Sequence, residues 1–426
     1  MTETLRVVLT LLVFAAALGG VLIRPRGWNE AWWTVGGAIV LLVTGLVSPQ
    51  AALAVTWAGK DVLLFLLALL LLSALLEKSG FFEWAAICAA RAAQGDARRL
   101  FRNVFLLGSV ITAALSLDTT AVILTPLTLA FVTRLKVPAR PYVFACAFVA
   151  NTASLLLPVS NLTNLLFTAA FHLPFSGFVA RMALPQIAAL VVNYACFRFL
   201  FRGQLPERFD PAVLPEPLSV VPHRRYFEGA VVILALVLVG YFVVPFAHIP
   251  PYAVGFAGCV LMAFWGLQTR QFEARIFREI AWSLFPFVIG LFVLVRGVEN
   301  LGLAGSAAHW LKTSGGNNIA VILATAGGAG LASNLVNNIP AALLAQGVLK
   351  TAHAGPPMIY SALLGTNIGP NLTLFGSLAT MLVLTTARKK GEEIRGLDFF
   401  KVGMIVTPLT LLAAAMTLWL TFLVKN

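Results

Sequence analysis

Long apolar segments, separated by short polar connections, dominate this chain of 426 residues. A helix needs about 20 apolar residues to cross a hydrocarbon core of ~30 Å. Continuous spans of this order lie at 5–23, 31–47, 61–77, 179–200, 227–245, 252–268, 282–298 and 403–423. Since they lack the short alternation of an outer-membrane barrel, they predict an all-α polytopic membrane protein. The first span carries no convincing cleavage site, so it is predicted to be a membrane helix and not a signal peptide.

Four further apolar regions are interrupted by polar residues. Residues 100–133 and 318–350 each run from apolar to polar and back to apolar, which predicts two helical hairpins. Residues 140–172 and 358–387 each contain a proline followed by Asn-Leu-Thr, which predicts two broken membrane helices. The shorter amphipathic stretch 81–93 is typical of a helix that lies at the membrane interface.

The order of these segments occurs twice. A plain span, a hairpin, a broken span and a plain span follow one another in residues 1–200 and again in residues 227–426. The Pro-rich and charged segment 201–226 is predicted to link the two halves. We expect two inverted-topology repeats, with about 10 transmembrane helices, 2 re-entrant helical hairpins and 2 broken helices. This architecture is typical of secondary transporters, whose sites lie near the midplane at the helix breaks.

Charge predicts how the chain is oriented. Hydrophobic residues make up 59% of the chain and charged residues 11%, and the net charge is +13. If the linker 201–226 is cytoplasmic, 23 Lys and Arg residues face the cytoplasm and 7 face outside, as the positive-inside rule requires. Both termini are then predicted to be outside. We interpret the positive charge as a sign of orientation in the lipid bilayer and predict no nucleic acid partner. The count leaves open whether each hairpin is re-entrant or crosses fully.

The two breaks place hydrogen-bonding side chains at membrane depth, with Asn161 and Thr163 in the first and Asn371 and Thr373 in the second. A break inside hydrocarbon is tolerated only where it is buried in protein or lines a wet cavity. The freed helix ends carry partial charges that bind ions or polar solutes, and Asn and Thr can complete such a site. The alternative is that these residues only satisfy the backbone at a kink. Their mid-span positions disfavour N-glycosylation.

Asp118 is the acidic residue that the pattern places at membrane depth, in the stretch SLDTT (116–120) at the tip of the first hairpin, beside Thr119 and Thr120. An acid inside the membrane is by default a candidate functional residue, so we predict a role in proton coupling. The alternative, compatible with it, is that Asp118 caps the second helix of the hairpin. Glu77 and Glu299 end plain spans and are predicted to be interfacial.

The sequence carries no sign of a metal site, a cofactor or an ATP-binding motif. The four cysteines, Cys88, Cys146, Cys196 and Cys259, stand at least 50 residues apart without a CxxC or His-rich cluster. Walker A is absent, and AGGAG (326–330) is a small-residue packing run. We therefore predict a membrane transporter, not an enzyme, that has no ATPase domain of its own.

Four stretches resemble a known family: SLDTTAVILTPLTLAFV (116–132), ANTASLLLPVSNLTNLL (150–166), SNLVNNIPAALL (333–344) and GTNIGPNLTLFGSLATMLVL (365–384). They are similar to the bacterial arsenite efflux permeases of the ArsB type, within the ion transporter superfamily. The resemblance covers nearly the whole chain. It implies a two-hairpin inverted-repeat fold in the bacterial inner membrane, and export of arsenite or antimonite driven by the proton gradient. In some relatives a separate soluble ATPase also docks on the permease.

The resemblance also implies which residues form the site. Asp118 matches the acid of the first hairpin tip, and Asn337 and Asn338 match the second tip. The implied substrate-binding residues are Asn151, Asn161, Thr163, Asn337, Asn338, Asn367, Asn371 and Thr373. This chain departs from the pattern at Asn151 and Asn367, where some members carry aspartate. This departure puts in doubt a mechanism in which several carboxylates carry protons, and it makes Asp118 the principal candidate for that role.

Three interpretations compete. Arsenite near neutral pH is mostly the uncharged trihydroxide, which a neutral Asn, Thr and Ser cage suits better than an arginine clamp, so proton-coupled export of arsenite or antimonite is the principal prediction. The alternative is a sodium/proton antiporter or a sodium-coupled anion transporter of the same superfamily. A third interpretation, a membrane scaffold or receptor, is disfavoured by the matched intramembrane breaks.

Overall fold

The regular structure of the chain is helical. The computed structural model describes residues 2–23, 25, 28–243, 249–302, 305–314 and 318–423. In these ranges the secondary structure consists of helices, apart from one isolated bridge between Asp96 and Arg208. The predicted all-α class is therefore confirmed.

The first half of the chain contains one helical hairpin and one interrupted helix. Its helices are α1 (Glu3–Ile23), α2 (Glu30–Val43), α3 (Pro49–Ala58), α4 (Lys60–Lys78), α5 (Phe81–Arg91), α6 (Ala97–Ala114), α7 (Leu117–Thr119), the π-helical turn η2 (Thr120–Leu124), α8 (Thr125–Arg134), α9 (Arg140–Thr152), α10 (Leu162–Phe171) and α11 (Phe175–Leu200). The first hairpin is α6 followed by α7, η2 and α8. The first interrupted helix is α9 followed by α10.

The second half repeats this order. Its helices are α12 (Arg224–Val243), α13 (Pro251–Gln268), α14 (Ile276–Glu279), α15 (Leu284–Glu299), α16 (Gly305–Thr313), α17 (Ile319–Val336), α18 (Asn338–Ala352), α19 (Pro356–Ile368), α20 (Leu378–Lys389) and α21 (Gly396–Leu423). The second hairpin is α17 with α18, and the second interrupted helix is α19 with α20.

Helix packing relates the two halves by an approximate two-fold operation. Helix α2 packs on α15, and their counterparts α13 and α4 pack on each other. Likewise α1 packs on α2 as α12 does on α13, and α6 packs on α9 as α17 does on α19. The last helices of the halves, α11 and α21, pack against each other. Each half of this fold is therefore a structural repeat of the other.

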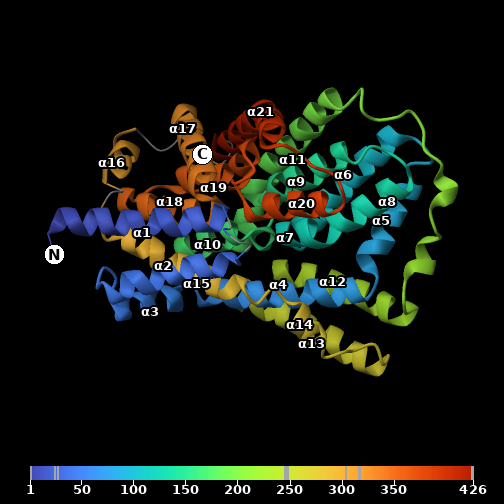
Figure 1. Ribbon diagram of the computed structural model, residues 1–426, viewed down its shortest axis with the longest axis horizontal. Coiled ribbons are helices and arrows are strands. Elements are labelled where there is room, and N and C mark those ends of the chain that lie inside the picture. Colours follow the sequence, from blue (N-terminus) through green and yellow to red (C-terminus); the bar gives the residue numbers. More distant parts are fainter. Residues whose placement is uncertain are drawn as a thin grey trace.

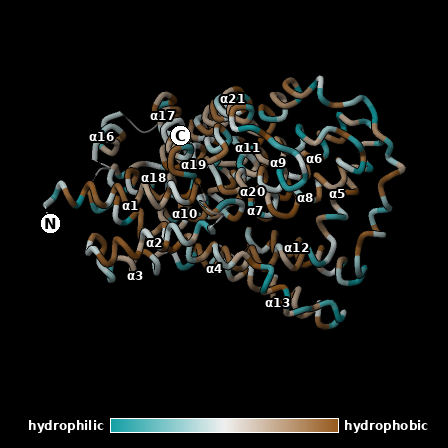
Figure 2. Tube along the Cα trace, in the orientation of Figure 1, coloured by the Kyte–Doolittle hydropathy of each residue, from teal (hydrophilic) through white to brown (hydrophobic). Residues whose placement is uncertain are grey.

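The two hairpins enter the molecule from opposite ends. Figure 1 shows α5, α6 and α8 near the long green connection between the halves, and α16, α17 and α18 at the far end of the long axis. Figure 2 shows that this connection is largely hydrophilic, whereas the long helices between the two ends are mostly hydrophobic. The repeats are thus inverted relative to the long axis, which we take as the membrane normal.

Several helices are long and apolar enough to span a bilayer alone. Among the described residues these are α1, α11, α12, α13, α17 and α21, and α3 with α4 forms a further span bent by 51°. Helices α2 and α15, with 14 and 16 residues, are shorter than the about 20 residues that a straight span needs. Arg24, Arg26 and Lys425, which entered the charge count, and both chain termini lie outside the described residues.

The connection between the halves is held against the first hairpin. Arg91 at the end of α5 forms an ion pair with Glu216 at 2.7 Å, and its guanidinium also donates to the carbonyl of Leu214 at 3.4 Å. The amide of Phe209 donates to the carbonyl of Gly95 at 2.8 Å. These contacts order the segment 201–223 along α5 and the start of α6.

Small residues let the second hairpin lie directly on its interrupted helix. A methyl group added to Gly365 of α19 would overlap the carbonyl oxygen of Ala326 in α17, and one added to Gly369 would overlap the backbone of Gly330. Such residues allow helix backbones to approach closely inside membranes. The run AGGAG (326–330) therefore has the packing role that its composition predicts.

Candidate functional site

The first interrupted helix breaks between Ala153 and Asn161. Helix α9 ends at Thr152, two short 3-10 turns follow, and α10 starts at Leu162. Asn161 is the N-cap of α10, because its side-chain oxygen accepts from the amide of Thr163 at 3.1 Å. An N-cap of this kind satisfies one of the amides that a helix start leaves free.

The second interrupted helix breaks between Gly369 and Ser377. Here the N-cap of α20 is Ser377, whose hydroxyl accepts from the amide of Thr380 at 3.1 Å. Asn371 instead lies in the 3-10 turn that extends α19. The two Asn-Leu-Thr triplets are therefore not structurally equivalent, although the matching letters predicted that they were. By position in the helices, Asn161 is equivalent to Ser377, because each is the N-cap of the second helix of its pair. Asn151 is equivalent to Asn367, because they are the penultimate residues of α9 and α19 respectively.

Asn367 joins the second interrupted helix to the first. Its side-chain oxygen accepts from Asn161 Nδ2 at 2.5 Å, from the Ser154 hydroxyl at 2.9 Å and from the Thr163 hydroxyl at 3.4 Å. Its Nδ2 donates to Asn164 Oδ1 at 2.9 Å. All five residues are buried, so these hydrogen bonds are shielded from water and rigidly connect the two repeats.

Asn151 and Asn371 form a second connection. Asn151 Nδ2 donates to Asn371 Oδ1 and to the hydroxyl of Thr380, both at 2.9 Å. Asn371 Nδ2 donates to the hydroxyl of Thr152 at 2.9 Å. The Oδ1 atom of Asn151 is buried without a hydrogen-bond partner. Each interrupted helix is thus bound to the other through side chains more than 200 positions away in sequence.

The tip of the first hairpin is capped by Ser116, not by Asp118. The Ser116 hydroxyl accepts from the amide of Thr119 at 3.1 Å. The Thr119 hydroxyl also lies 2.9 Å from that of Ser73 in α4, and the Thr120 hydroxyl lies 2.7 Å from that of Thr112. Among the described residues, no hydrogen bond or ion pair involves the Asp118 side chain, so the capping role considered for Asp118 is wrong.

The tip of the second hairpin has a strained backbone. Asn337 has φ 74° and ψ 158°, a region that is essentially restricted to glycine. Its Nδ2 donates to the carbonyl of Phe375 at 3.2 Å, and its Oδ1 is buried without a partner. The amide of Asn338 donates to the carbonyl of Gly376 at 2.9 Å. The Thr373 hydroxyl donates to Asn334 of α17 at 2.8 Å, so Thr373 fixes the hairpin against the break.

A small cavity lies where the hairpin tips and the breaks meet. Its volume is about 30 Å³, room for about two waters. Its polar lining consists of Asp118, Asn161 and Asn338. Its apolar lining consists of Leu66, Leu117, Leu162, Leu284, Phe287, Val288, Ile339, Leu378 and Ala379.

Four helical segments start at this cavity. Leu117, Leu162, Asn338 and Leu378 line it, and each is the first residue of its segment: α7, α10, α18 and α20 respectively. Helix N-termini carry partial positive charge and free amide groups. Their convergence favours electron-rich oxygen atoms in the cavity.

The predicted site residues therefore fall into three groups. Asp118, Asn161 and Asn338 line the cavity. Behind it, Asn151, Thr163, Asn367 and Asn371 form the buried connection between the repeats. Asn337, Thr373, Thr119 and Thr120 fix the hairpin tips. Ser154, Asn164 and Ser377 also belong to these hydrogen bonds but were not among the predicted site residues. The motif Ser-Leu-x-Thr, present at 116–119 and 377–380, is the signal that marks two of the caps.

A larger vestibule opens toward the end of the molecule opposite the linker. Its volume is about 460 Å³, and charged residues of its lining include Arg296, Glu299 and Lys350. Its lining also includes Val62, Leu166, Phe292 and Leu343, which lie four residues from the cavity-lining Leu66, Leu162, Val288 and Ile339. Since four residues are about one helical turn, or 5.4 Å, roughly one layer of apolar side chains separates the vestibule from the cavity.

Comparison with known proteins places this geometry among membrane transporters. The model of the family described as "ArsB: Arsenical pump membrane protein" matches residues 9–422. The "Arsenical pump membrane protein" of Escherichia coli K12 is 32% identical over 426 residues, covering 96% of this chain and 98% of that protein. Among solved structures, the YdaH transporter of Alcanivorax borkumensis has a TM-score of 0.60 at 17% identity, covering 89% of this chain and 90% of that one. MtrF of Neisseria gonorrhoeae, from "a class of antimetabolite efflux pumps", has a TM-score of 0.57 at 14% identity, covering 98% and 94%. These two solved structures resemble this chain in fold.

Proposed function

We propose that this chain, which belongs to the ArsB family of arsenical pump membrane proteins, exports arsenite or antimonite from the cytoplasm in exchange for protons. The family assignment makes the chain a membrane transporter of arsenicals. The metalloid species, the coupling ion and the residues that act on them are the proposed part.

The lining of the central cavity carries this proposal. It combines two amides and one carboxyl with the starts of four helical segments, and it includes no arginine, lysine or cysteine. The neutral trihydroxide of arsenic or antimony both donates and accepts hydrogen bonds, so it can donate to Asp118 and accept from the amide of Asn338 once the cavity opens beyond its about 30 Å³. Capture by several thiolates is not available there, because Cys88, Cys146, Cys196 and Cys259 lie outside the cavity lining.

Asp118 is the proposed proton carrier. It is the single charged side chain of the cavity lining, and it has no fixed partner among the described residues. Its protonation can therefore respond to what occupies the cavity. A proton that enters from outside neutralises the carboxyl, and its release on the cytoplasmic side restores an acceptor for the next substrate molecule. Export of metalloid in one direction is thereby linked to proton movement in the other.

A movement of one group of helices past another is the proposed route to alternating access. Hydrogen bonds join the hairpins to the interrupted helices and the interrupted helices to each other. Helices α4 and α15 contribute part of the apolar wall of the cavity, and the contact of Ser73 in α4 with Thr119 is the hydrogen bond that a movement past α4 would have to break. We assign the vestibule to the outer side and the linker 201–226 to the cytoplasm, with both termini outside. A shift of the hairpins and interrupted helices past α4 and α15 by about one helical turn would connect the cavity to the vestibule.

Transport into everted vesicles tests the proposal. The wild-type chain should accumulate arsenite when a proton gradient is imposed and lose that accumulation when a protonophore removes it. Asp118→Asn should bind substrate but fail to concentrate it, because asparagine cannot titrate. Asp61→Asn is the matched control, since Asp61 is exposed at the start of α4. Uphill transport by the Asp118→Asn variant would refute the coupling role and direct attention to Glu77 and Glu299.

The same vesicles test two further parts of the proposal. Accumulation without added nucleotide shows that the soluble ATPase partner implied by the family resemblance is not required. Labelling of a cysteine introduced at Pro217 in intact cells tests the orientation. Reaction with an impermeant reagent from outside would place the linker on the wrong side.

A sodium-coupled anion transporter is the second candidate. The observation that favours it is the convergence of helix N-termini on the cavity, which would stabilise an anion. A sodium gradient that drives transport in the absence of a proton gradient would favour this candidate over the first.

A further inference from the structure

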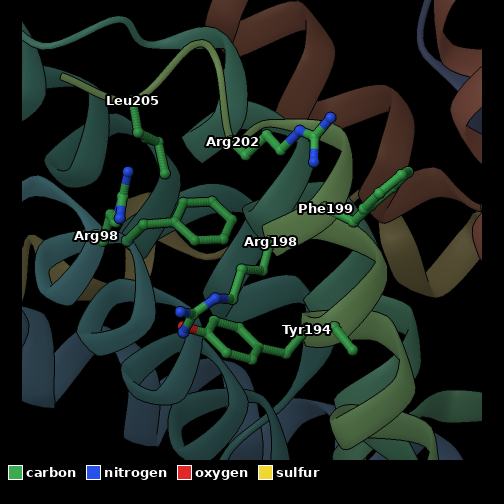
Figure 3. A pocket seen from close by; sticks show the side chains of 8 residues that line it. Arg98, Tyr194, Arg198, Phe199, Arg202 and Leu205 are labelled. Carbon is green, nitrogen blue, oxygen red and sulfur yellow. The ribbon is translucent and has the colours of Figure 1, made fainter. Parts of the chain in front are cut away.

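A second, strongly basic pocket lies near the linker, away from the transport site. Its volume is about 450 Å³, and it is lined by Arg98, Phe101, Tyr194, Ala195, Arg198, Phe199, Arg202 and Leu205. Figure 3 shows the guanidinium groups of Arg98, Arg198 and Arg202 at separate points around it. Arg98 belongs to the first turn of α6, whereas Arg198 belongs to the last turn of α11 and Arg202 follows it. Two distant segments thus supply cations to one pocket.

The cations of this pocket form no direct ion pair within the described part of the chain. Among the described residues, none of the three guanidinium groups forms an ion pair, whereas the neighbouring Arg99 lies 3.7 Å from Asp96. Asp96 caps this helix start and attracts the Arg98 charge, so the positive charge that most needs a ligand is that of Arg198 and Arg202. The pocket is therefore suited to a ligand that brings its own negative charge and oxygen atoms.

The surface beside the pocket is apolar and exposed. Ile187 and Val191 of α11 are 59% and 61% exposed, and Leu106 and Val110 of α6 are 51% and 65% exposed. Phe199, which lines the pocket, is 66% exposed, and the Arg202 guanidinium lies 5.0 Å from its ring centre. These residues continue away from the arginines along the exposed sides of both helices. A ligand that fits this arrangement has an anionic head and a hydrocarbon tail.

We propose that this pocket binds the phosphate headgroup of an anionic phospholipid of the leaflet on the linker side, with an acyl chain along α6 and α11. Arginine suits this role because its planar guanidinium binds two phosphate oxygens at once. Basic pockets between membrane helices on the cytoplasmic side commonly hold such headgroups. The lipid would bridge the first hairpin to α11, which packs on α21 of the other repeat.

Native mass spectrometry of the full-length protein in detergent provides the test. Phosphatidylglycerol, phosphatidylcholine and inorganic phosphate are added separately at equal concentrations. The wild-type chain should retain phosphatidylglycerol in preference to the other two. The double variant Arg198→Gln/Arg202→Gln should bind it about tenfold to thirtyfold more weakly. Arg225→Gln, which removes an exposed arginine at the start of α12 outside the pocket, should change binding less than about twofold.

Two further measurements keep the result decisive. Arg202→Lys retains the charge but loses the two-oxygen contact, so it should fall between the wild-type chain and the double variant. If the double variant does not elute as a folded species, Arg98→Gln and Arg202→Lys decide in its place. Equal retention of phosphatidylcholine, or equal losses in Arg225→Gln and the pocket variants, would overturn the proposal. Retention of inorganic phosphate equal to that of phosphatidylglycerol would show a free-anion site and overturn the lipid assignment.

Discussion

Asn367→Ala should be among the most destabilising amide truncations at the helix breaks. The Asn367 side chain accepts from Asn161, Ser154 and Thr163 and donates to Asn164. After truncation, Asn161 and Ser154 keep a hydrogen bond to each other, at 3.2 Å. Asn164 Oδ1 and the Thr163 hydroxyl lose the side-chain partner that the structure gives them.

The expected magnitude follows from these two groups. A buried polar group without a partner costs about 1–3 kcal/mol, so Asn367→Ala should lower the stability by about 2–6 kcal/mol. Asn161→Ala removes mainly the N-cap of α10, which is worth about 0.5–2 kcal/mol. Asn161 lines the cavity, whereas Asn367 does not. We therefore expect Asn367→Ala to affect folding more, and Asn161→Ala to affect transport at equal expression more.

Thermal stability in detergent, followed by size-exclusion chromatography, measures the first effect. Asn318→Ala is the matched control, because Asn318 caps α17 through the amide of Ala320 at 2.9 Å and is exposed. The control should match Asn161→Ala in stability and the wild-type chain in transport. If Asn367→Ala were no less stable than Asn318→Ala, the buried connection between the repeats would contribute nothing, and the reasoning would be refuted.

Three further predictions concern the backbone and the surface. Asn337→Gly should raise the melting temperature, because relief of a backbone strain of about 1–3 kcal/mol at φ 74° and removal of the unpartnered Oδ1 should outweigh the lost hydrogen bond to Phe375, worth about 0.5–1.5 kcal/mol; an unchanged or lower temperature would contradict this. Gly365→Ala should lower stability and transport together, because its methyl group would push α19 away from Ala326, whereas Gly327→Ala, which meets nothing within 4 Å, should have little effect. The amides of Arg99 and Arg98 lower the pKa of Asp96. The stabilisation from the Asp96 charge should therefore be complete above the unfolded pKa of about 3.9, and it should vanish as the pH falls through the folded pKa. Unfolding curves of the wild-type chain and of Asp96→Asn should then converge in acid.

The sequence predicted the class of fold because that class follows from local composition. Apolar length, proline and polar interruptions mark spans, hairpins and breaks without knowledge of which helices meet. The run of prolines and charges around Pro211 and Pro217 marked the connection in the same way.

The arrangement within the site could not be predicted, because it depends on pairing across more than 200 residues. The letters Asn-Leu-Thr match at 161 and 371, yet one asparagine starts a helix and the other extends one. Asn151 and Asn367 are predicted to bind substrate, and the sequence carries no sign that their amides also connect the two repeats in the structure. The apolar wall from Leu66 and Phe287 carries no local signal, since leucine and phenylalanine occur throughout such spans.

The crossed hydrogen bonds between the breaks also bear on the order of biosynthesis. Asn161 leaves the ribosome 206 residues before Asn367, and Asn151 leaves 220 residues before Asn371. At about 5–20 residues per second, this interval is roughly 10–45 s. Throughout it the polar groups of the first break lack their native partners, and each unpaired group costs about 1–3 kcal/mol. The transport site is therefore expected to be completed only after translation has passed residue 371, and until then the first half is the form most open to insertion errors and proteolysis.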